Sequence, residues 1–356
     1  MQQEELINEI TAALYTLTWK PGPLKWFVLT YPTIREVFAP YFKDRVVSHV
    51  IFALISPIFE RYFIFDSHSC REGKGTLKGI ERFEHHIRSV TDNYRRPAYC
   101  LNIDISGYFM SIVRERLYEI IWDTLRQFQR RYPEYTDYVL VDYIIRAFLF
   151  RDPLEGCVYV GDPALKGIVP EGKSLFDKEP GVGIPIGDVI NQLFSNIYMN
   201  PFDQFVKRIL KISGYLRYVD DGRCIHQSYD YLMECKDRCG EFLDKELSLT
   251  LHPHKTTITD IYDTNYFLGA AVLPYRRYAN NKTMTRFDNF IGTLDADLRN
   301  GIPVDMETTL ATMNSRLGYL QHFDEKTAIN RALASAPFVC DRFSFASGFS
   351  QAHLSE

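Results

Sequence analysis

The sequence predicts an α+β fold, in which short β-rich segments and longer helical segments follow one another. Hydrophobic residues make up 46% and aromatic residues 14% of the 356-residue chain, which indicates a globular protein rather than a disordered one. The length exceeds that of one typical domain and allows a sizeable core. One stretch, from Tyr215 to His226, has the pattern of a β-hairpin, with a strand, a tight turn before a glycine, and a second strand.

Composition and charge exclude several classes of protein. No run of about 18 uncharged apolar residues is present, which argues against a membrane span. The polar, acidic start from Met1 to Glu5 is not that of a secretory signal. The seven cysteines are scattered, and we expect reduced thiols in a cytoplasmic protein. Proteins that bind nucleic acid over a long surface are usually basic, because Lys and Arg contact the phosphates, whereas this chain has a net charge of −4. The charge suggests that a partner protein supplies positive surface.

The first part of the chain predicts a helix, a strand pair and a second helix. An amphipathic pattern up to about residue 20 ends at Pro21-Gly22-Pro23. Residues 26–29 and 34–38 are strand-like and are joined by the turn signal Tyr31-Pro32-Thr33. An apolar helix follows from Lys43 to Phe59.

A basic loop and a buried strand come next. Residues 70–76, with the sequence CREGKGT, form a glycine-rich basic loop that can approach phosphate, before a helix over 77–90. Residues 99–105 are β-rich and bring Asp104 to the end of the run, where a buried carboxylate is costly unless it is paired or metal-bound. From this position alone, a purely structural role for Asp104 stays open.

The central part predicts helices separated by a long loop. Helices are expected over 112–128 and 133–150, and the glycine- and proline-rich stretch 151–180 is expected to be an ordered loop. The turn-rich segment 181–188 then opens a helix that runs to about Leu210, with Asp188 as its N-cap. The opening turn of this helix offers free backbone N–H groups to a nucleotide or template.

Two adjacent carboxylates, Asp220 and Asp221, stand at the tip of the predicted hairpin. Two like charges at this position are unfavourable unless a cation lies between them, and oxygen ligands suit Mg²⁺. A solvated Asp-Asp-Gly turn is the alternative. Beyond the hairpin we expect a helix over 231–247, strands over 248–252 and 266–270, and helices from about Arg286 onward.

Asp104 and Asp220 both end β-rich runs, which suggests that neighbouring strands carry them to a shared edge. Such carboxylates can hold two Mg²⁺ ions roughly 4 Å apart, one at an attacking hydroxyl and one at a leaving phosphate. The chemistry would be phosphoryl transfer driven by positioning and electrostatics.

The order of these segments resembles the ordered palm motifs of reverse transcriptases. The matching segments are Asp104–Phe109, Gly183–Gln192, Tyr218–Asp221, Leu251–Lys255 and Phe267–Gly269. The resemblance covers residues from about 29 to 325 and implies a right-hand polymerase. It divides the chain into an N-terminal extension (1–28), fingers (29–99 and 120–182), a palm (100–119 and 183–277) and a helical thumb with a C-terminal tail (278–356).

The resemblance also implies roles for individual residues. Asp104, Asp220, Asp221 and the carbonyl of Ile105 match metal ligands, and Lys255 matches the lysine that protonates the leaving pyrophosphate. On the nucleotide side, Arg35 matches the arginine that reaches the triphosphate, Phe109 the gate that rejects ribonucleotides, and Gln192 the residue beneath the templating base and nucleotide. The residues expected to contact primer or template are Lys43, Arg71, Lys74, Gly187 and the primer-grip residues Phe267, Leu268 and Gly269.

Finer features are similar to the enzymes of diversity-generating retroelements. Ile186-Gly187 and Asn191-Gln192 stand where most retroviral and group II intron relatives carry Gln-Gly and Ser-Pro. This sub-type implies template RNA, a DNA primer, dNTPs, two Mg²⁺ ions that Mn²⁺ can replace, and a small basic accessory protein. Gly222-Arg223, and Thr33 in place of lysine, depart from the family pattern. A phage-defence or CRISPR-linked reverse transcriptase and a degenerate RNA-binding scaffold are the alternatives.

Overall fold

The structure of this chain is a computed structural model that describes residues 2–30 and 33–355. Tyr31 and Pro32, which the sequence assigns to a turn, lie outside the described residues. The chain divides into two units, one made of Met1–Val90 and Ala98–Ile258 and the other of Thr91–Pro97 and Thr259–Glu356. Among the described residues, no helix combines the length and the apolar character needed to cross a bilayer.

The first unit contains most of the predicted elements. Its helices are α1 (Gln2–Tyr15), α2 (Phe42–Phe59), α3 (Thr76–Val90), α4 (Tyr108–Ser111), α5 (Arg114–Arg131), α6 (Tyr138–Leu149), α7 (Val189–Gln204), which continues as a π-helix over Phe205–Ile209, and α8 (Tyr229–Leu247). Its strands are β1 (Leu24–Leu29), β2 (Arg35–Pro40), β3 (Tyr99–Ile103), β4 (Val158–Tyr159), β5 (Gly214–Tyr218) and β6 (Asp221–His226). Strand β7 (Thr257–Asp260) crosses the boundary between the units.

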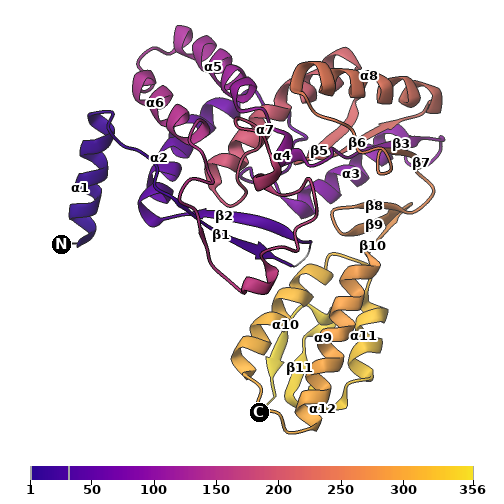
Figure 1. Cartoon of the computed structure of the whole chain (residues 1–356). Coiled ribbons are helices and arrows are strands. Elements are labelled where there is room, and N and C mark those ends of the chain that lie inside the picture. The colour runs from indigo at the N-terminus through magenta and orange to yellow at the C-terminus, as the bar shows by residue number, and fades with distance from the viewer. Residues whose placement is uncertain (1, 31–32, 356) are drawn as a thin grey trace. The chain divides into compact units, whose positions relative to one another are not determined.

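A sheet of order β5-β6-β3-β7 forms the centre of this unit. Its strands have buried side chains on both faces, because α7 and α8 pack on one face and α3 on the other (Figure 1). In β5, this two-sided burial leaves every residue from Gly214 to Arg217 buried. Packing on both faces therefore fixes the ends of the strands. The backbone positions of the carboxylates predicted at those ends are fixed with them.

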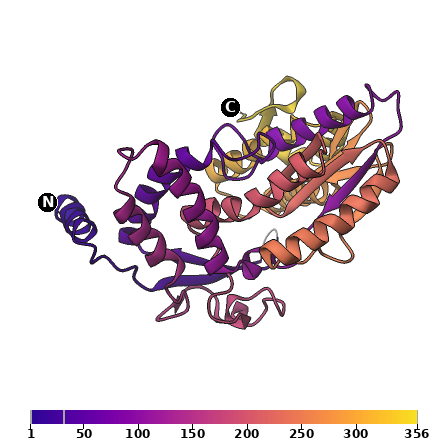
Figure 2. The same cartoon turned by 90° about the horizontal axis from the view of Figure 1, so that it is seen from above.

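A helical bundle and a small second sheet complete the first unit. Helices α2, α5, α6 and α7 pack together beside the central sheet (Figure 2). Helix α5 buries Leu117, Ile121, Leu125 and Phe128, which are spaced along one helical face. The second sheet has the order β2-β1-β4, with β1 and β2 antiparallel as the sequence predicts. Its burial pattern alternates, with Leu24, Trp26 and Val28 facing inward.

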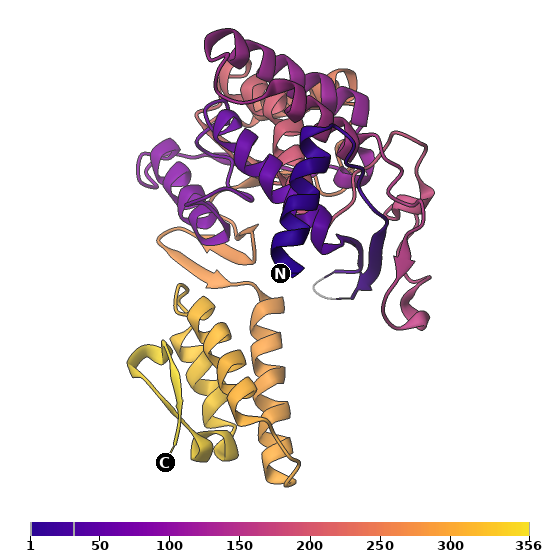
Figure 3. The ribbon, with the colours of Figure 1, turned by 90° about the vertical axis from the view of Figure 1, so that its left-hand side faces the viewer.

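The second unit combines a β-meander with helices. Strands β8 (Asn265–Phe267), β9 (Ala270–Leu273) and β10 (Arg276–Ala279) form a sheet of order β10-β9-β8. Helices α9 (Asn281–Arg299), α10 (Met306–Leu320), α11 (Lys326–Ala334) and α12 (Pro337–Arg342) follow, with a final hairpin of β11 (Phe343–Phe345) and β12 (Ala352–Leu354) (Figure 3). The asparagine at 280 caps α9 by accepting a hydrogen bond from the Thr283 N–H, so this helix begins before the predicted Arg286.

Two predictions of local structure are wrong. Residues 248–252 are not a strand: Ser248 ends α8 with a left-handed φ of 50°, and only Leu251 makes a β-bridge, to Ile105. Residues 266–270 are not one strand but the end of β8, a turn, and the start of β9, since Leu268 and Gly269 have φ of 51° and 86°. Asp188 occupies the N-cap position of α7, as the sequence predicts, and its carboxylate accepts a hydrogen bond from the Ser48 hydroxyl.

Candidate active site

Strand pairing brings Asp104 to the tip of the β5–β6 hairpin. In that hairpin Tyr218 pairs with Asp221, which leaves Val219 and Asp220 as the turn. Strand β3 runs antiparallel to β6, with Ile103 opposite Gly222. One step further along the same register, Asp104 comes level with Asp221. Three carboxylates from distant parts of the sequence therefore meet at one edge of the central sheet, as the sequence predicts.

Lys255 lies beside this edge and faces Asp104. The segment 250–252 is held against residues 104–106 by two backbone hydrogen bonds, from His252 N to Asp104 O and from Ser106 N to Thr250 O. Beyond it, Lys255 Nζ lies 3.2 Å from Asp104 Oδ1 and 3.3 Å from Oδ2. The lysine side chain is 60% exposed, so this ion pair adds little to stability. Its position makes Lys255 available to donate a proton at the site.

Asp221 has its own cation, Arg223, on the same strand. The Arg223 guanidinium forms an ion pair with the Asp221 carboxylate and donates a hydrogen bond of 2.8 Å to the Gly222 carbonyl. The arginine side chain is nearly buried. Two of the three carboxylates thus face a positive charge from the protein itself. The Gly222-Arg223 departure from the expected pattern thus places a cation beside Asp221.

Asp220 lies in surroundings that disfavour its charged form. Burial, together with the neighbouring carboxylates of Asp104 and Asp221, raises the pKa of Asp220 to about 6. Burial also raises the pKa of Asp221, against the opposing effect of Arg223. A carboxylate that is costly to ionise within a cluster of like charges gains most from a bound cation.

The chemistry of these groups fits a hard divalent cation. Carboxylate and carbonyl oxygens are the ligands that Mg²⁺ prefers. The carbonyl of Ile105 points away from residues 250–252, because the flanking residues make the hydrogen bonds of that bridge. Within the described residues, no three His, Cys, Asp or Glu side chains already converge closely enough to form a metal cage. The fit therefore rests on the donor types and on the raised pKa of Asp220.

The three residues predicted on the nucleotide side lie on separate elements of the first unit. Arg35 is exposed at the start of β2, where its Nη2 donates to Thr33 Oγ1 at 2.7 Å. Phe109 is half-buried on α4, and its carbonyl accepts a hydrogen bond of 2.9 Å from Ile184 N. Gln192 is exposed on the first turns of α7. All three side chains have the accessibility that a substrate contact requires.

Gly187 has a structural reason to be glycine. Its φ is +131°, and a Cβ there would lie 2.6 Å from the Phe38 carbonyl oxygen. The Ile186 carbonyl also accepts a hydrogen bond of 2.7 Å from Phe38 N. The loop that opens α7 is therefore fixed to β2, the strand that begins with Arg35. Contact of Gly187 with primer or template stays a prediction.

Of the predicted basic contacts, Arg71 is already engaged within the protein. Its side chain is 7% exposed, pairs with Glu60 at 2.7 Å and donates to the carbonyls of Ile64 and Ser67. These contacts hold the loop of Arg71 in place, and contact of Arg71 with primer or template stays a prediction. Lys74 lies 3.4 Å above the centre of the exposed Phe65 ring, and Lys43 pairs with Glu9 at 2.7 Å while half-exposed.

The predicted primer-grip residues belong to the second unit. Phe267 is 2% exposed in the β8–β9 hairpin, so its ring packs in the core of the second unit. Leu268 and Gly269 form the turn of this hairpin and are half-exposed. Contact of these three residues with a primer stays a prediction, and the turn residues are the more accessible ones.

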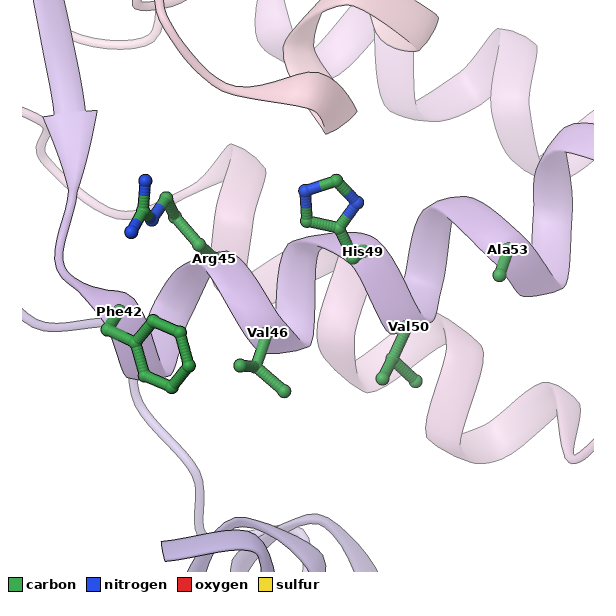
Figure 4. Close-up of a pocket in the computed structure, with 6 residues that line it drawn as sticks. All are labelled: Phe42, Arg45, Val46, His49, Val50 and Ala53. Atoms are coloured by element: carbon green, nitrogen blue, oxygen red, sulfur yellow. The ribbon is translucent and has the colours of Figure 1, made fainter. Parts of the chain in front are cut away.

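Two features of the first unit were not found from the sequence. One is a buried ion pair between Arg217 and Asp203 behind the hairpin, which the arginine inside an apolar strand could have signalled. The other is a pocket of about 480 Å³ along α2, lined by Phe42, Arg45, Val46, His49, Val50 and Ala53. Arg45 and His49 extend from one side of the helix, and Phe42, Val46 and Val50 from another (Figure 4).

Comparisons with known proteins indicate the family of this chain. The sequence profile of the family described as reverse transcriptase (RNA-dependent DNA polymerase) matches residues 32–272, which include all three carboxylates. Protein YkfC of Escherichia coli (strain K12) is 25% identical over 307 residues, covering 74% of this chain and 71% of that protein.

Solved telomerase structures are similar in fold. Telomerase from Candida albicans, solved with a fragment of telomeric RNA, has a TM-score of 0.52 at 11% identity over 90% of this chain. The match covers 58% of that telomerase, so this chain spans little more than half its length. Apo telomerase from Candida tropicalis also has a TM-score of 0.52, at 12% identity, over 93% of this chain and 64% of that one.

Proposed function

The chain belongs to the reverse transcriptase family, and we propose that it copies an RNA template into DNA by extending a primer with dNTPs. The observation that carries this proposal is the strand register that brings Asp104 level with Asp221 beside Asp220. Its fold is that of a right-hand polymerase. We assign residues 29–99 and 120–182 to the fingers, 100–119 and 183–277 to the palm, and 278–356 to the thumb and tail.

In this mechanism the chain supplies position and charge. Asp104, Asp220, Asp221 and the Ile105 carbonyl would hold divalent ions, which we propose to be Mg²⁺. When bound, such ions activate the primer hydroxyl and stabilise the leaving pyrophosphate. Lys255, already beside Asp104, would give a proton to the pyrophosphate. Arg35 would hold the triphosphate, and Phe109 and Gln192 would contact the sugar and base.

Primer extension tests this function directly. Purified protein is incubated with a primed poly(rA) template, dTTP and Mg²⁺, and the products are resolved by length. We expect extension that requires the metal and stops on chelation. A folded protein that binds RNA but extends no primer under any metal would instead support the alternative of a degenerate scaffold.

Arg35→Ala is expected to raise the KM for dNTP by about 10- to 150-fold, with a smaller loss of kcat. The change removes one charge-assisted contact with the triphosphate, worth about 1.5–3 kcal/mol. Steady-state extension with varied dNTP measures both constants. Arg116→Ala, at a half-exposed arginine on α5 that pairs with Glu119 and Glu246, is the matched control. An unchanged KM and rate would remove Arg35 from the site.

We further propose that this enzyme is of the diversity-generating retroelement type. The Ile186-Gly187 pair and Gln192 support this sub-type, and the net charge of −4 is compatible with a small basic accessory protein. Its seven cysteines are free, which is compatible with work in the cytoplasm. Sequencing cDNA made from the co-purifying RNA tests the sub-type, and we expect errors concentrated at template adenines. Evenly distributed errors would favour a defence-associated reverse transcriptase.

A further inference from the structure

Arg217 is a buried charge directly behind the catalytic hairpin. It lies on β5, the strand that leads into the Val219-Asp220 turn, and is 1% exposed. An arginine at such a place is strongly unfavourable unless its donors are satisfied. Its contacts therefore explain why the fold keeps it.

Asp203, near the end of α7, supplies the opposite charge. The two side chains form a bidentate pair, with Arg217 Nε 2.8 Å from Asp203 Oδ1 and Nη2 2.7 Å from Oδ2. Asp203 is fully buried, and its Oδ1 also accepts a hydrogen bond of 2.8 Å from the Tyr215 hydroxyl. This geometry fixes the plane of the guanidinium, because two parallel hydrogen bonds allow one orientation.

The remaining donors of Arg217 reach the turn and a neighbouring segment. Nη1 donates to the Val219 carbonyl at 2.7 Å, and Nη2 to Ser67 Oγ at 3.2 Å. The backbone of Arg217 is also held, since its N–H donates to Asp66 O and its carbonyl accepts from His68 N, both at 2.9 Å. The guanidinium therefore connects α7, the segment 66–68 and the catalytic turn.

Val219 needs such support. Its φ is 55°, in the left-handed region that a β-branched residue rarely adopts. Its carbonyl belongs to the planar peptide group that joins it to Asp220. A hydrogen bond that holds this carbonyl also fixes the direction in which Asp220 leaves the turn.

We propose that Arg217 is a positioning residue, which uses its pairing with Asp203 to hold the Val219-Asp220 peptide so that the Asp220 carboxylate is aimed at the metal site. This inference rests on the proposed function, since it assumes that Asp220 binds the divalent ion. The proposal gives the buried Arg217–Asp203 ion pair a role in metal affinity in addition to its role in stability. Lysine cannot replace arginine in this role, because a single nitrogen cannot hold both Asp203 oxygens and the Val219 carbonyl.

Arg217→Lys tests the proposal with two separate readouts. Mn²⁺ affinity is measured by electron paramagnetic resonance on the protein alone, and the Mg²⁺ concentration for half-maximal primer extension is measured in parallel. Thermal unfolding reports stability. We expect Arg217→Lys to remain folded and to weaken both metal constants by about tenfold or more, since misplacement by about 1 Å can cost about 100-fold. Arg238→Lys, on the surface of α8, is the control and leaves both constants unchanged.

Asp203→Asn is the second variant, because it keeps the side-chain shape and removes the charge that anchors Arg217. It should weaken metal binding in the same direction. A folded Arg217→Lys protein with a lower melting temperature and unchanged metal constants would overturn the proposal, because the pair would then be structural only. Loss of the fold in both variants would count against it too. If the wild-type protein binds Mn²⁺ but never extends a primer, the proposed function fails while the Mn²⁺ comparison still decides the role of Arg217.

Discussion

Asp220→Asn is expected to lower primer extension by about 10³-fold or more while leaving the protein folded. Asparagine keeps the shape of the side chain but removes the negative charge at the hairpin tip, and electrostatic contributions of this kind dominate phosphoryl transfer. Single-turnover extension on an RNA template measures the loss. The control is Asp237→Asn on the exposed face of α8, which should extend at the wild-type rate.

The same substitution is expected to stabilise the protein when no divalent metal is present. The pKa of Asp220 is raised to about 6 in the folded state, so the folded state binds its proton more tightly than the unfolded chain. Stability contributed by this group is therefore present at low pH and falls as the pH rises through about 6. At pH 7 the asparagine variant should be more stable by about 1–3 kcal/mol.

Bound Mg²⁺ should reverse this order of stability, so that the wild type becomes more stable than the Asp220→Asn variant. Mg²⁺ binds the folded wild type and should raise its melting temperature by an amount that grows with the logarithm of the Mg²⁺ concentration above its Kd, whereas the Asn variant should respond little. Thermal unfolding of both proteins at pH 5 and pH 7, with and without Mg²⁺, gives the four melting temperatures that are needed for each protein. Extension by Asp220→Asn at the wild-type rate, or an equal response of both proteins to Mg²⁺, would show that Asp220 is not a metal ligand.

Much of the site could be predicted because its signals are local. The hairpin from Tyr215 to His226 is visible in the apolar flanks and the Asp-Asp-Gly turn, and Asp104 stands out as a carboxylate at the end of a β-rich run. The α+β class and most helices follow from periodicity in the same way. These features depend on residues that are neighbours in sequence.

The features that sequence reasoning missed depend on distant partners. Arg71 has the composition of a nucleic-acid contact, yet Glu60 and two carbonyls engage it, and only the folded loop brings these groups together. The pairing of Arg217 with Asp203 joins a strand to a helix. Residues 248–252 alternate like a strand, but the end of α8 and a single bridge to Ile105 decide their conformation. Tertiary context overrides the local pattern in each case.

Phe109→Ala is expected to reduce discrimination against ribonucleotides by about 5- to 150-fold. The proposed gate works by steric exclusion of the 2′-hydroxyl, and overpacking of this kind costs about 1–3 kcal/mol. Steric exclusion of the 2′-hydroxyl requires a side chain that cannot move aside. Phe109 meets this requirement, because its carbonyl is tied to Ile184 N and its ring packs against Tyr108 at a centroid distance of 5.4 Å.

The measurement is the ratio of kcat/KM for a dNTP to that for the matching rNTP on one RNA template. Phe109→Ala should lower this ratio mainly by improving the use of rNTP, with a change of only a few-fold for dNTP. Phe109→Tyr keeps the aromatic wall and should retain the wild-type ratio. Phe150→Ala, at a half-exposed phenylalanine after α6, controls for general effects of losing a ring. An unchanged ratio in Phe109→Ala, with normal dNTP incorporation, would move the gate to another residue.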